Sequence, residues 1–559
     1  MTRIAVVGTG FGGIGAAVRL LQDGERDLVL FERSDDIGGV WRDNTYPGAA
    51  CDVASHLYSF SFAPTGRWSR RFAPQREIHD YLRRVAADFG VLPHVRLRTE
   101  VLAAAWDGSA WQLELSDGTT YEADVVIAAC GQLSRPSRPL IPGLDDLAGR
   151  TFHSAEWDHD HDLTGRRVAV LGTGASAIQF VPEIAEVAGQ VSVFQRSAPY
   201  VIPKPDRAYG PLAQRALDRA PALLTLDRLR TFCANESRSL GFNTEPRLMK
   251  LLEARFLKHL ESAVPDPELR AKVTPTDPMG CKRILQSNDW YPALQLPHVD
   301  LVTEPIARVT PEGVLTQDGV LHEADTLILG TGFAATELLA PMSVTGRGGL
   351  RLDQAWSRGA EAYLGTTVHG FPNLFLLYGP NTNLGHSSIV LMLESQIAYV
   401  RQAVRLLRGG GSVEVREDVM RSYNRRLQRR LAGTVFAGGC RSWYLDASGR
   451  NTQNWPGTTL EFRLRTRRLR PEHHVVLPAA AVTTSCSSSG RTSEPWSTRP
   501  ASFSSWPSRM PSSRTSTSRT PPSCRARPPA CATAATSTGP DDVAAVGQAE
   551  GLGRAHGSG

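Results

Sequence analysis

Glycine residues near the N-terminus have the spacing of a phosphate-binding turn. Gly8, Gly10 and Gly13 form the pattern G-x-G-x-x-G directly after the apolar run 4–7. The first glycine allows a sharp turn, the second lets the backbone approach a pyrophosphate, and the third lets a helix pack on the strand. Glu32 ends a second apolar run, where a carboxylate can accept bonds from ribose hydroxyl groups. These residues predict dinucleotide binding.

The same pattern recurs further along the chain. Gly172, Gly174 and Ala177 follow the apolar run 168–171 in the variant spacing G-x-G-x-x-A. Arg196 stands at the position that Glu32 occupies in the first copy. A carboxylate suits a ribose diol, whereas a guanidinium matches the oxygens of a 2′-phosphate. The first copy therefore predicts an ADP moiety without a 2′-phosphate, as in FAD, and the second predicts NADPH.

The segment 38–52 has the composition of a loop that holds a flat ring. Gly39 permits close backbone approach, Trp41 and Tyr46 provide flat apolar surfaces, and Asp52 adds a carboxylate. The alternative, an aromatic-rich loop that packs on the core, stays open from composition alone.

The composition excludes several classes of protein. With 559 residues, 41% hydrophobic and 21% charged, the chain is expected to form two or three globular domains without a membrane-spanning segment. A net charge of +6 without a basic, aromatic face argues against nucleic-acid binding. The eight cysteines are scattered and lack C-x-x-C pairs, which predicts reduced thiols and no structural metal. The first strand begins too early for a signal peptide, so we expect a cytoplasmic protein.

These observations predict an α/β fold with two Rossmann-like dinucleotide-binding domains, a helical insertion and a disordered C-terminal tail. A strand at 325–332 is expected to return to the sheet of the first domain, and the tail lacks apolar periodicity. The expected parts are the FAD-binding domain (1–145 and 325–471), the NADPH-binding domain (146–204 and 276–324), the helical insertion (205–275) and the tail (472–559).

Several further motifs resemble those of the type I Baeyer–Villiger monooxygenases, within the flavin-containing monooxygenase superfamily. The resemblance runs from about residue 3 to residue 470. Leu147 replaces Phe in the family fingerprint F-x-G-x-x-x-H-x-x-x-W-[P/D], which otherwise matches with Gly149, His153, Trp157 and Asp158. The signature G-G-x-W, then Y-P-G and Asp, is complete in Gly39, Trp41, Tyr46, Pro47, Gly48 and Asp52.

Three shorter segments add to the resemblance. Residues 330–335 are similar to the family segment A-T-G-F-D-A, with Gly330 for Ala and Ala334 for Asp. Lys282 and Arg283 match the motif that holds the family's active-site arginine. Residues 442–451, including Trp443, resemble a C-terminal segment that contacts cofactor.

The resemblance implies that NADPH reduces FAD, and that the flavin then reacts with O₂ to give a C4a-peroxide that converts a small ketone to an ester or lactone. It implies that Arg283 stabilises negative charge on the reacting oxygens and that Asp52 orients Arg283. It further implies a role in domain linkage for the fingerprint residues. The expected cofactor contacts are Gly8, Gly10, Gly13, Glu32, Gly39, Trp41, Asp52 and Tyr58 for FAD, and Gly172, Gly174, Ser176, Ala177, Arg196, Ser197 and Lys282 for NADPH. Trp443 is expected to contact one of the two cofactors.

Three alternatives have distinct signatures. A flavin monooxygenase that oxygenates nitrogen or sulfur shares most motifs, but Asp158 and the Lys282–Arg283 pair favour the Baeyer–Villiger reaction. A thiol–disulfide reductase needs a redox cysteine pair, and none is suitably spaced. A non-catalytic nucleotide-binding protein would lack the yellow colour of bound flavin. The particular ketone and the oligomeric state are not predicted.

Overall fold

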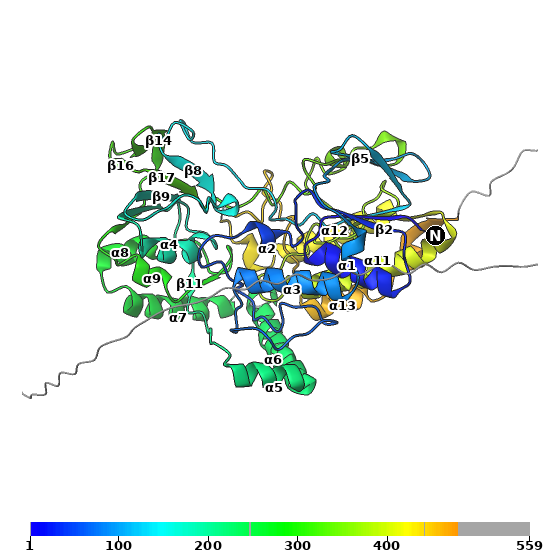
Figure 1. Cartoon of the computed structure of the whole chain (residues 1–559), viewed down its shortest axis with the longest axis horizontal. Coiled ribbons are helices and arrows are strands. Elements are labelled where there is room, and N and C mark those ends of the chain that lie inside the picture. The colour runs from blue at the N-terminus through cyan, green and yellow to red at the C-terminus, as the bar shows by residue number, and fades with distance from the viewer. Residues whose placement is uncertain (1, 245–246, 441, 479–559) are drawn as a thin grey trace, which may run out of the picture. The chain divides into compact units, whose positions relative to one another are not determined.

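A computed structural model describes residues 2–244, 247–440 and 442–478. Over these residues the chain contains two five-stranded sheets whose strands are all parallel (Figure 1). The first sheet has the order β19-β7-β1-β2-β3, with bounds Leu374–Leu376, Val125–Ala128, Ile4–Val7, Leu28–Phe31 and Val95–Arg96. The second has the order β13-β10-β9-β17-β8, with bounds Val299–Val302, Gln190–Phe194, Arg167–Leu171, Thr326–Leu329 and Arg150–His153. The predicted α/β class with two Rossmann-like sheets is confirmed.

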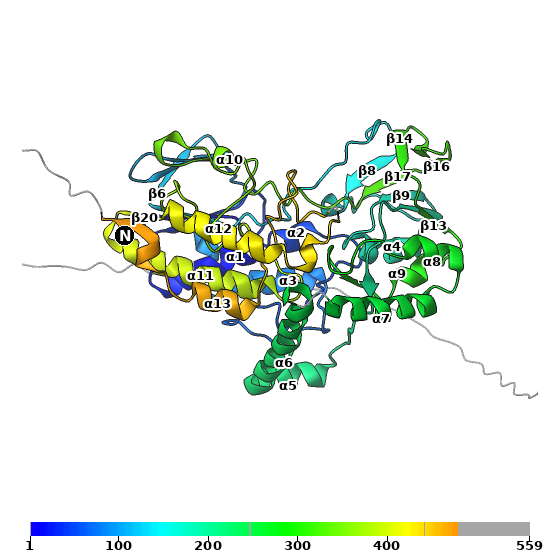
Figure 2. The same cartoon turned by 180° about the vertical axis from the view of Figure 1, so that it is seen from behind.

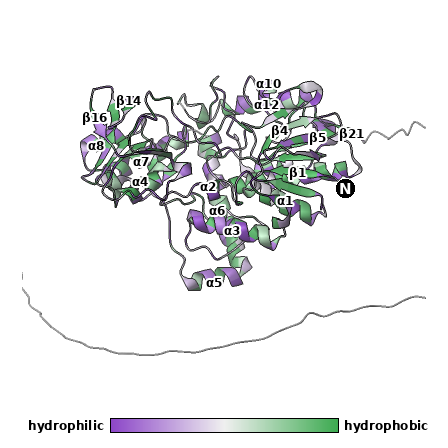
Figure 3. Cartoon of the chain, turned by 45° about the horizontal axis from the view of Figure 1, so that its top comes forward, coloured by the Kyte–Doolittle hydropathy of each residue, from purple (hydrophilic) through white to green (hydrophobic). Residues whose placement is uncertain are grey.

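The first sheet is buried because it is covered on both faces. Helix α1 (Phe11–Gln22) packs with α3 (Gln75–Asp88) and α11 (Ile389–Leu406) in one hydrophobic cluster, and α11 also contacts α13 (Thr459–Thr466). Residues that point to the other face belong to a second cluster. That cluster includes the mainly antiparallel sheet of β18 (Ser343–Thr345), β4 (Val101–Trp106), β5 (Trp111–Leu115) and β6 (Thr120–Ala123). Figure 3 shows the ribbon around β1 in the colour of hydrophobic residues.

The glycines of the first turn are required by the packing. A Cβ at Gly13 would lie 1.9 Å from the carbonyl oxygen of Gly8, and Gly8 itself has a φ of +101°. A side chain at position 13 would therefore push α1 away from the turn. The predicted strand–turn–helix unit forms because glycine alone fits there.

The strand predicted at 325–332 lies in the other sheet from the one expected. β17 pairs with β9 and β8, so it belongs to the second sheet, and the expected return to the first sheet is wrong. The chain rejoins the first sheet only at β19, which pairs with β7. The expected second part of the first domain therefore begins after β17 and not at residue 325.

The helical insertion is confirmed as a group of helices, seen from both sides in Figures 1 and 2. Helix α6 (Pro221–Ser239) is bonded to the rest of the chain at two places. Its Asp227 Oδ2 lies 2.7 Å from His56 Nδ1, and its Arg228 Nη1 donates to Ser59 Oγ at 2.8 Å. Nearer its C-terminal end, Glu236 Oε1 accepts from Thr459 Oγ1 at 2.6 Å. The elements are α5 (Pro211–Arg219), α6 (Pro221–Ser239), the π-helical turn η3 (Leu240–Thr244), α7 (Arg247–Ala263) and α8 (Pro267–Val273).

The start of the predicted tail is ordered, which corrects the boundary at 472. β21 (His474–Leu477) forms an antiparallel pair with β20 (Ser412–Val415), the strand before α12 (Glu417–Leu431). The rest of the predicted tail, 479–559, lies outside the described residues. Within the described part of the chain, no helix is both long and apolar enough to cross a membrane.

Candidate active site

A single large cavity brings most of the predicted site residues together. Its volume of about 1420 Å³ exceeds the 300–1,000 Å³ typical of small-molecule pockets, so it has room for more than one nucleotide. Residues from both glycine turns line it. The predicted residues that line it are Gly8, Gly10, Glu32, Gly39, Trp41, Asp52, Tyr58, Gly172, Gly174, Ser176, Arg196, Ser197, Lys282, Arg283 and Trp443. Gly13, Ala177 and the fingerprint residues Gly149, His153, Trp157 and Asp158 are not part of its lining.

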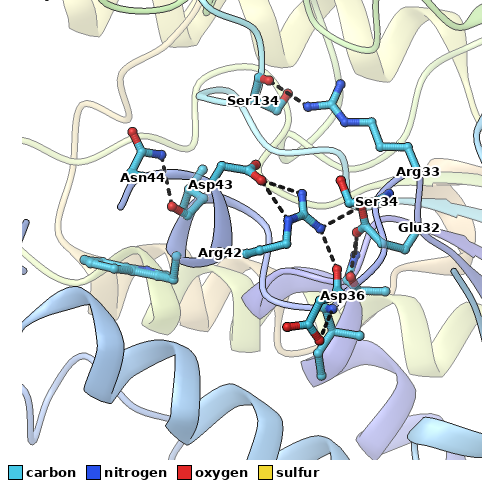
Figure 4. Close-up of polar contacts among 12 residues, drawn as sticks. Glu32, Arg33, Ser34, Asp36, Arg42, Asp43, Asn44 and Ser134 are labelled. Atoms are coloured by element: carbon cyan, nitrogen blue, oxygen red, sulfur yellow. Dashed lines mark hydrogen bonds and ion pairs between the residues drawn. The ribbon is translucent and has the colours of Figure 1, made fainter. Parts of the chain in front are cut away.

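At the first glycine turn, several donors hold Glu32 in place. Its Oε2 accepts from the backbone N–H and the hydroxyl of Thr9, at 3.2 and 2.5 Å. Its Oε1 accepts from Ser34 N at 3.1 Å and lies 2.9 Å from Arg42 Nη1 (Figure 4). Arg42 also donates to Asp43. Sequence reasoning missed Arg42, although its place directly after Trp41 in the segment 38–52, called the aromatic loop from here on, was a usable signal.

The aromatic loop lies against the first glycine turn. A Cβ on Gly39 would approach Gly10 Cα to 3.1 Å, so the two backbones lie close together with no side chain between them, and they stay accessible to a ligand. Trp41 Nε1 donates to Tyr58 Oη at 3.1 Å, and the two rings meet edge to face. The alternative of a loop that only packs on the core is not what is observed, since both aromatic residues line the cavity. Bare backbone beside flat rings fits a dinucleotide that carries a ring system.

Arg283 and Asp52 form an ion pair at the cavity wall. Asp52 Oδ2 accepts from Arg283 Nε at 3.1 Å and from Nη2 at 2.5 Å, and about a third of each side chain is exposed (33% and 30%). Burial would raise the pKa of Asp52, but the facing guanidinium and its hydrogen bonds hold that pKa below its usual value. The carboxylate in turn raises the pKa of Arg283. A fixed positive charge therefore faces the cavity.

A second group of cationic and polar residues lies at the other glycine turn. Arg196, which follows β10, is exposed and lines the cavity. Lys282 Nζ donates to Ser197 Oγ at 2.8 Å and pairs with Asp277 at 2.5 Å. Helix α4 (Ala177–Ala185) begins directly after Ser176, so its N-terminus faces the same region. Two cations, a hydroxyl and a helix N-terminus together suit a phosphate.

The fingerprint residues lie outside the cavity and pack between chain segments. A Cβ on Gly149 would lie 1.9 Å from the carbonyl oxygen of Asp325, so only glycine fits. His153 Nδ1 accepts from Ala155 N at 3.1 Å. Trp157 packs on Phe180 of α4. Asp158 Oδ2 lies 4.0 Å from Arg150 and Asp158 Oδ1 accepts from Asp160 N.

Gln179 of α4 holds the aromatic loop, and the sequence offered no signal for it. Its Nε2 donates to Ala50 O at 3.0 Å, while its Oε1 accepts from Tyr46 Oη at 3.0 Å and from Ala50 N at 3.4 Å. Phe180, the next residue, meets the ring of Tyr46 edge to face. Gly48 approaches Gln179 so closely that a Cβ would lie 2.6 Å from its carbonyl oxygen. This contact joins the loop that carries Asp52 to the second dinucleotide unit.

Cys281 and Cys440 form a disulfide, with 6.2 Å between their Cα atoms. The expectation that all cysteines are reduced and scattered is therefore wrong for this pair. Its members are 159 residues apart, and spacing in the sequence cannot reveal a pair that folding brings together. Neither cysteine lines the cavity, which is where a flavin-dependent disulfide reductase would need them.

Two parallel sheets with glycine turns at one shared cavity define a dinucleotide-dependent oxidoreductase. The family model for flavin-binding monooxygenase-like proteins matches residues 1–223. A Baeyer–Villiger monooxygenase of Pseudomonas aeruginosa is 46% identical over 488 residues, covering 86% of this chain and 93% of the relative. One of Streptomyces coelicolor is 48% identical over 487 residues, with the same coverage.

Solved structures of the same kind resemble the chain over most of its length. A steroid monooxygenase bound to NADP matches with a TM-score of 0.76 and 30% identity, covering 85% of this chain and 99% of that one. The cyclohexanone monooxygenase of a Rhodococcus species bound to NADP⁺ matches with a TM-score of 0.77 and 26% identity, covering 86% and 99%. The chain belongs to the Baeyer–Villiger monooxygenases. The prediction of an NADPH-dependent flavoprotein monooxygenase is thereby confirmed.

Proposed function

We propose that Arg283 and Asp52 carry the oxidation of a small-molecule ketone by O₂ to an ester or lactone. The observation behind this assignment is their ion pair at the wall of a cavity that both dinucleotide turns share. FAD and NADPH are the cofactors, as they are in a solved monooxygenase complex with FAD and NADP that covers 83% of this chain. Bound FAD accepts hydride from NADPH and supplies the activation of O₂.

The FAD contacts follow from the first turn and the aromatic loop. Gly8, Gly10 and the N-terminus of α1 would hold the pyrophosphate, with Gly13 packed behind them. Glu32 would accept from the ribose hydroxyl groups, and its contacts with Thr9 and Arg42 hold its carboxylate in place. Gly39, Trp41 and Tyr58 would line the ring system.

Arg283 would stabilise the negative charge that develops on the reacting oxygens. Asp52 holds the guanidinium by two hydrogen bonds, so the charge is oriented before reaction and needs no rearrangement. A preorganised donor of this kind contributes about 3 to 4 kcal/mol to the transition state in well-studied enzymes. Asp52 is a positioning residue in this assignment, because it acts through Arg283.

The second turn would bind NADPH. Arg196, Ser197 and Lys282 would contact the 2′-phosphate, and Gly172, Gly174, Ser176 and Ala177 form the turn and helix start beneath the pyrophosphate. Trp443, from the C-terminal segment 442–451, would also contact the cofactor, since it lines the same cavity. The fingerprint residues Gly149, His153, Trp157 and Asp158 would act in domain linkage, since Trp157 packs on the helix that holds the aromatic loop.

The variant Arg283→Ala tests the central assignment. We expect it to bind FAD and to oxidise NADPH, but to form ester at least about a hundredfold more slowly than the wild type. The measurement compares NADPH consumption with ester yield for a panel of ketones. Arg166→Ala, an exposed arginine of the same domain, is the matched control. Ester formation at the wild-type rate in Arg283→Ala would refute the assignment.

Oxygenation of amines or sulfides is the second candidate. A panel that contains these substrates beside ketones decides between the two, because the Arg283–Asp52 pair is needed for charge that develops at a carbonyl oxygen. The particular ketone and a cytoplasmic location stay predictions, to be tested by the panel and by cell fractionation.

A further inference from the structure

The Cys281–Cys440 disulfide joins the two segments that bring Lys282 and Trp443 to the cavity. Cys281 directly precedes Lys282, and Cys440 lies three residues before Trp443. Both Lys282 and Trp443 line the cavity, whereas neither cysteine is part of its lining. The bond therefore connects the segments that bring these two residues to the proposed NADPH site.

Glycines let the two segments approach each other closely. A Cβ on Gly280 would lie 3.1 Å from Val435 Cγ2, and one on Gly438 would lie 3.3 Å from Cys281 Sγ. The backbone N–H of Cys440 donates to Cys281 Sγ at 3.3 Å, and both cysteines are buried. The disulfide thus lies where residues 278–283 pack closely against residues 435–440, a segment that begins with the 3₁₀ turn η6 (Val435–Ala437).

The segment that carries Trp443 is anchored in the C-terminal part of the first domain. Tyr444 is buried, its ring meets that of Phe436 edge to face, and Thr452 N donates to Tyr444 O at 3.3 Å. Lys282, in contrast, is fixed by Ser197 and Asp277 of the second domain. The Cys281–Cys440 bond is therefore a covalent link between two segments that are anchored in different parts of the fold.

We propose that the Cys281–Cys440 disulfide is a positioning cross-link of the NADPH site, which fixes the segment that carries Trp443 relative to the segment that carries Lys282. Affinity for NADP(H) then depends on whether the bond is intact. The proposal rests on the assignment of Lys282 and Trp443 to the NADPH site.

A phosphine reductant supplies the chemistry for a direct test. The phosphine is oxidised to its oxide with an oxygen atom from water, the S–S bond breaks, and the two sulfurs take up the hydrogens of that water as thiols. This experiment needs no variant, so it does not depend on whether a cysteine substitution folds.

The test measures the Kd for NADP⁺ of the FAD-loaded protein with and without the phosphine. We expect reduction to raise this Kd about tenfold in the wild type, because the segments of Lys282 and Trp443 are then no longer linked covalently and their relative position must be fixed on binding. C440S should have the raised Kd already and should not respond to the phosphine. C233S, which removes an exposed free cysteine on α6, should behave like the wild type. The content of FAD per chain should not change.

Two outcomes would overturn the proposal. One is a Kd that the phosphine leaves unchanged in the wild type. The other is mass-spectrometric detection of Cys281 and Cys440 as free thiols in protein purified without reductant. The variants Lys282→Ala and Trp443→Ala separate the two assumptions: if neither weakens NADP⁺ binding, the assigned NADPH site is wrong, whereas weakening there without a phosphine effect removes only the cross-link.

Discussion

The Arg283–Asp52 pair is the feature of individual side chains on which the proposed chemistry depends. Two hydrogen bonds fix the guanidinium, and Asp52 keeps its negative charge because the attraction of Arg283 outweighs the cost of burial. The pair comes from segments 231 residues apart, so it also joins the aromatic loop to the second domain.

A pH series on Asp52→Asn tests the charge of this pair. The folded-state pKa of Asp52 lies below its usual value near 3.9, so its stabilisation is fully present above that unfolded value and is lost as pH falls through the folded pKa. We expect the variant to be less stable by about 1 to 3 kcal/mol at pH 7, and the difference to shrink below about pH 4. Urea unfolding at several pH values measures it. An equal difference at pH 3 and pH 7 would show that the charge is not responsible.

Arg196 should decide between NADPH and NADH. Its guanidinium lines the cavity and is exposed, and only NADPH carries the phosphate that it would contact. Arg196→Ala should lower kcat/KM for NADPH about tenfold to a hundredfold and leave that for NADH nearly unchanged. Steady-state NAD(P)H oxidation with both cofactors measures this, with Arg166→Ala as the control. Equal losses with the two cofactors would remove Arg196 from the 2′-phosphate site.

Helix α4 and the aromatic loop form the contact on which the two dinucleotide units depend. Gln179 hydrogen-bonds to both backbone groups of Ala50 and accepts from Tyr46, and the rings of Tyr46 and Trp157 both pack against Phe180. Because Asp52 follows two residues after Ala50, this contact also sets the position of the carboxylate that orients Arg283.

Gln179→Ala should therefore lower both the stability of the protein and the yield of ester per NADPH consumed. Loss of three hydrogen bonds at a partly buried site should cost about 1 to 3 kcal/mol. We also expect more NADPH to be consumed per ester formed, since Arg283 would be held less firmly. Urea unfolding and the ratio of ester to NADPH check both effects, with Gln190→Ala on the domain surface as the control. A stable variant with an unchanged ratio would contradict this account.

For the molecule as a whole, the disulfide ties the second domain to the C-terminal part of the first. It closes a loop of 159 residues, and a cross-link of this length stabilises a protein by about 2 to 5 kcal/mol, chiefly by restricting the unfolded chain. A phosphine reductant should lower the Tm of the wild type and leave that of C440S unchanged, as calorimetry can measure. An identical wild-type Tm with and without the phosphine would mean that the bond does not contribute to stability.

The parts of the fold that local sequence determines were predictable. Glycine spacing, Glu32 and Arg196 each lie within one strand–turn–helix–strand unit, and both units form as expected. The errors concern partners that are distant in the chain. A buried strand followed by glycines does not specify its sheet, which is why β17 was misplaced, and neither the strand β21 nor the cysteine pair has a local signal. Gln179 gains its role only from partners that folding supplies, whereas Arg42 could have been found from its place directly after Trp41.

Incubation of the purified, FAD-loaded protein with NADPH, ¹⁸O₂ and a panel of ketones, amines and sulfides, followed by mass spectrometry of the products, tests the central claim most directly. The account predicts an ester or lactone that forms only with NADPH and carries one ¹⁸O atom, and that is lost in Arg283→Ala while NADPH oxidation continues. Unlabelled ester, or labelled amine or sulfide oxides without any ester, would contradict it.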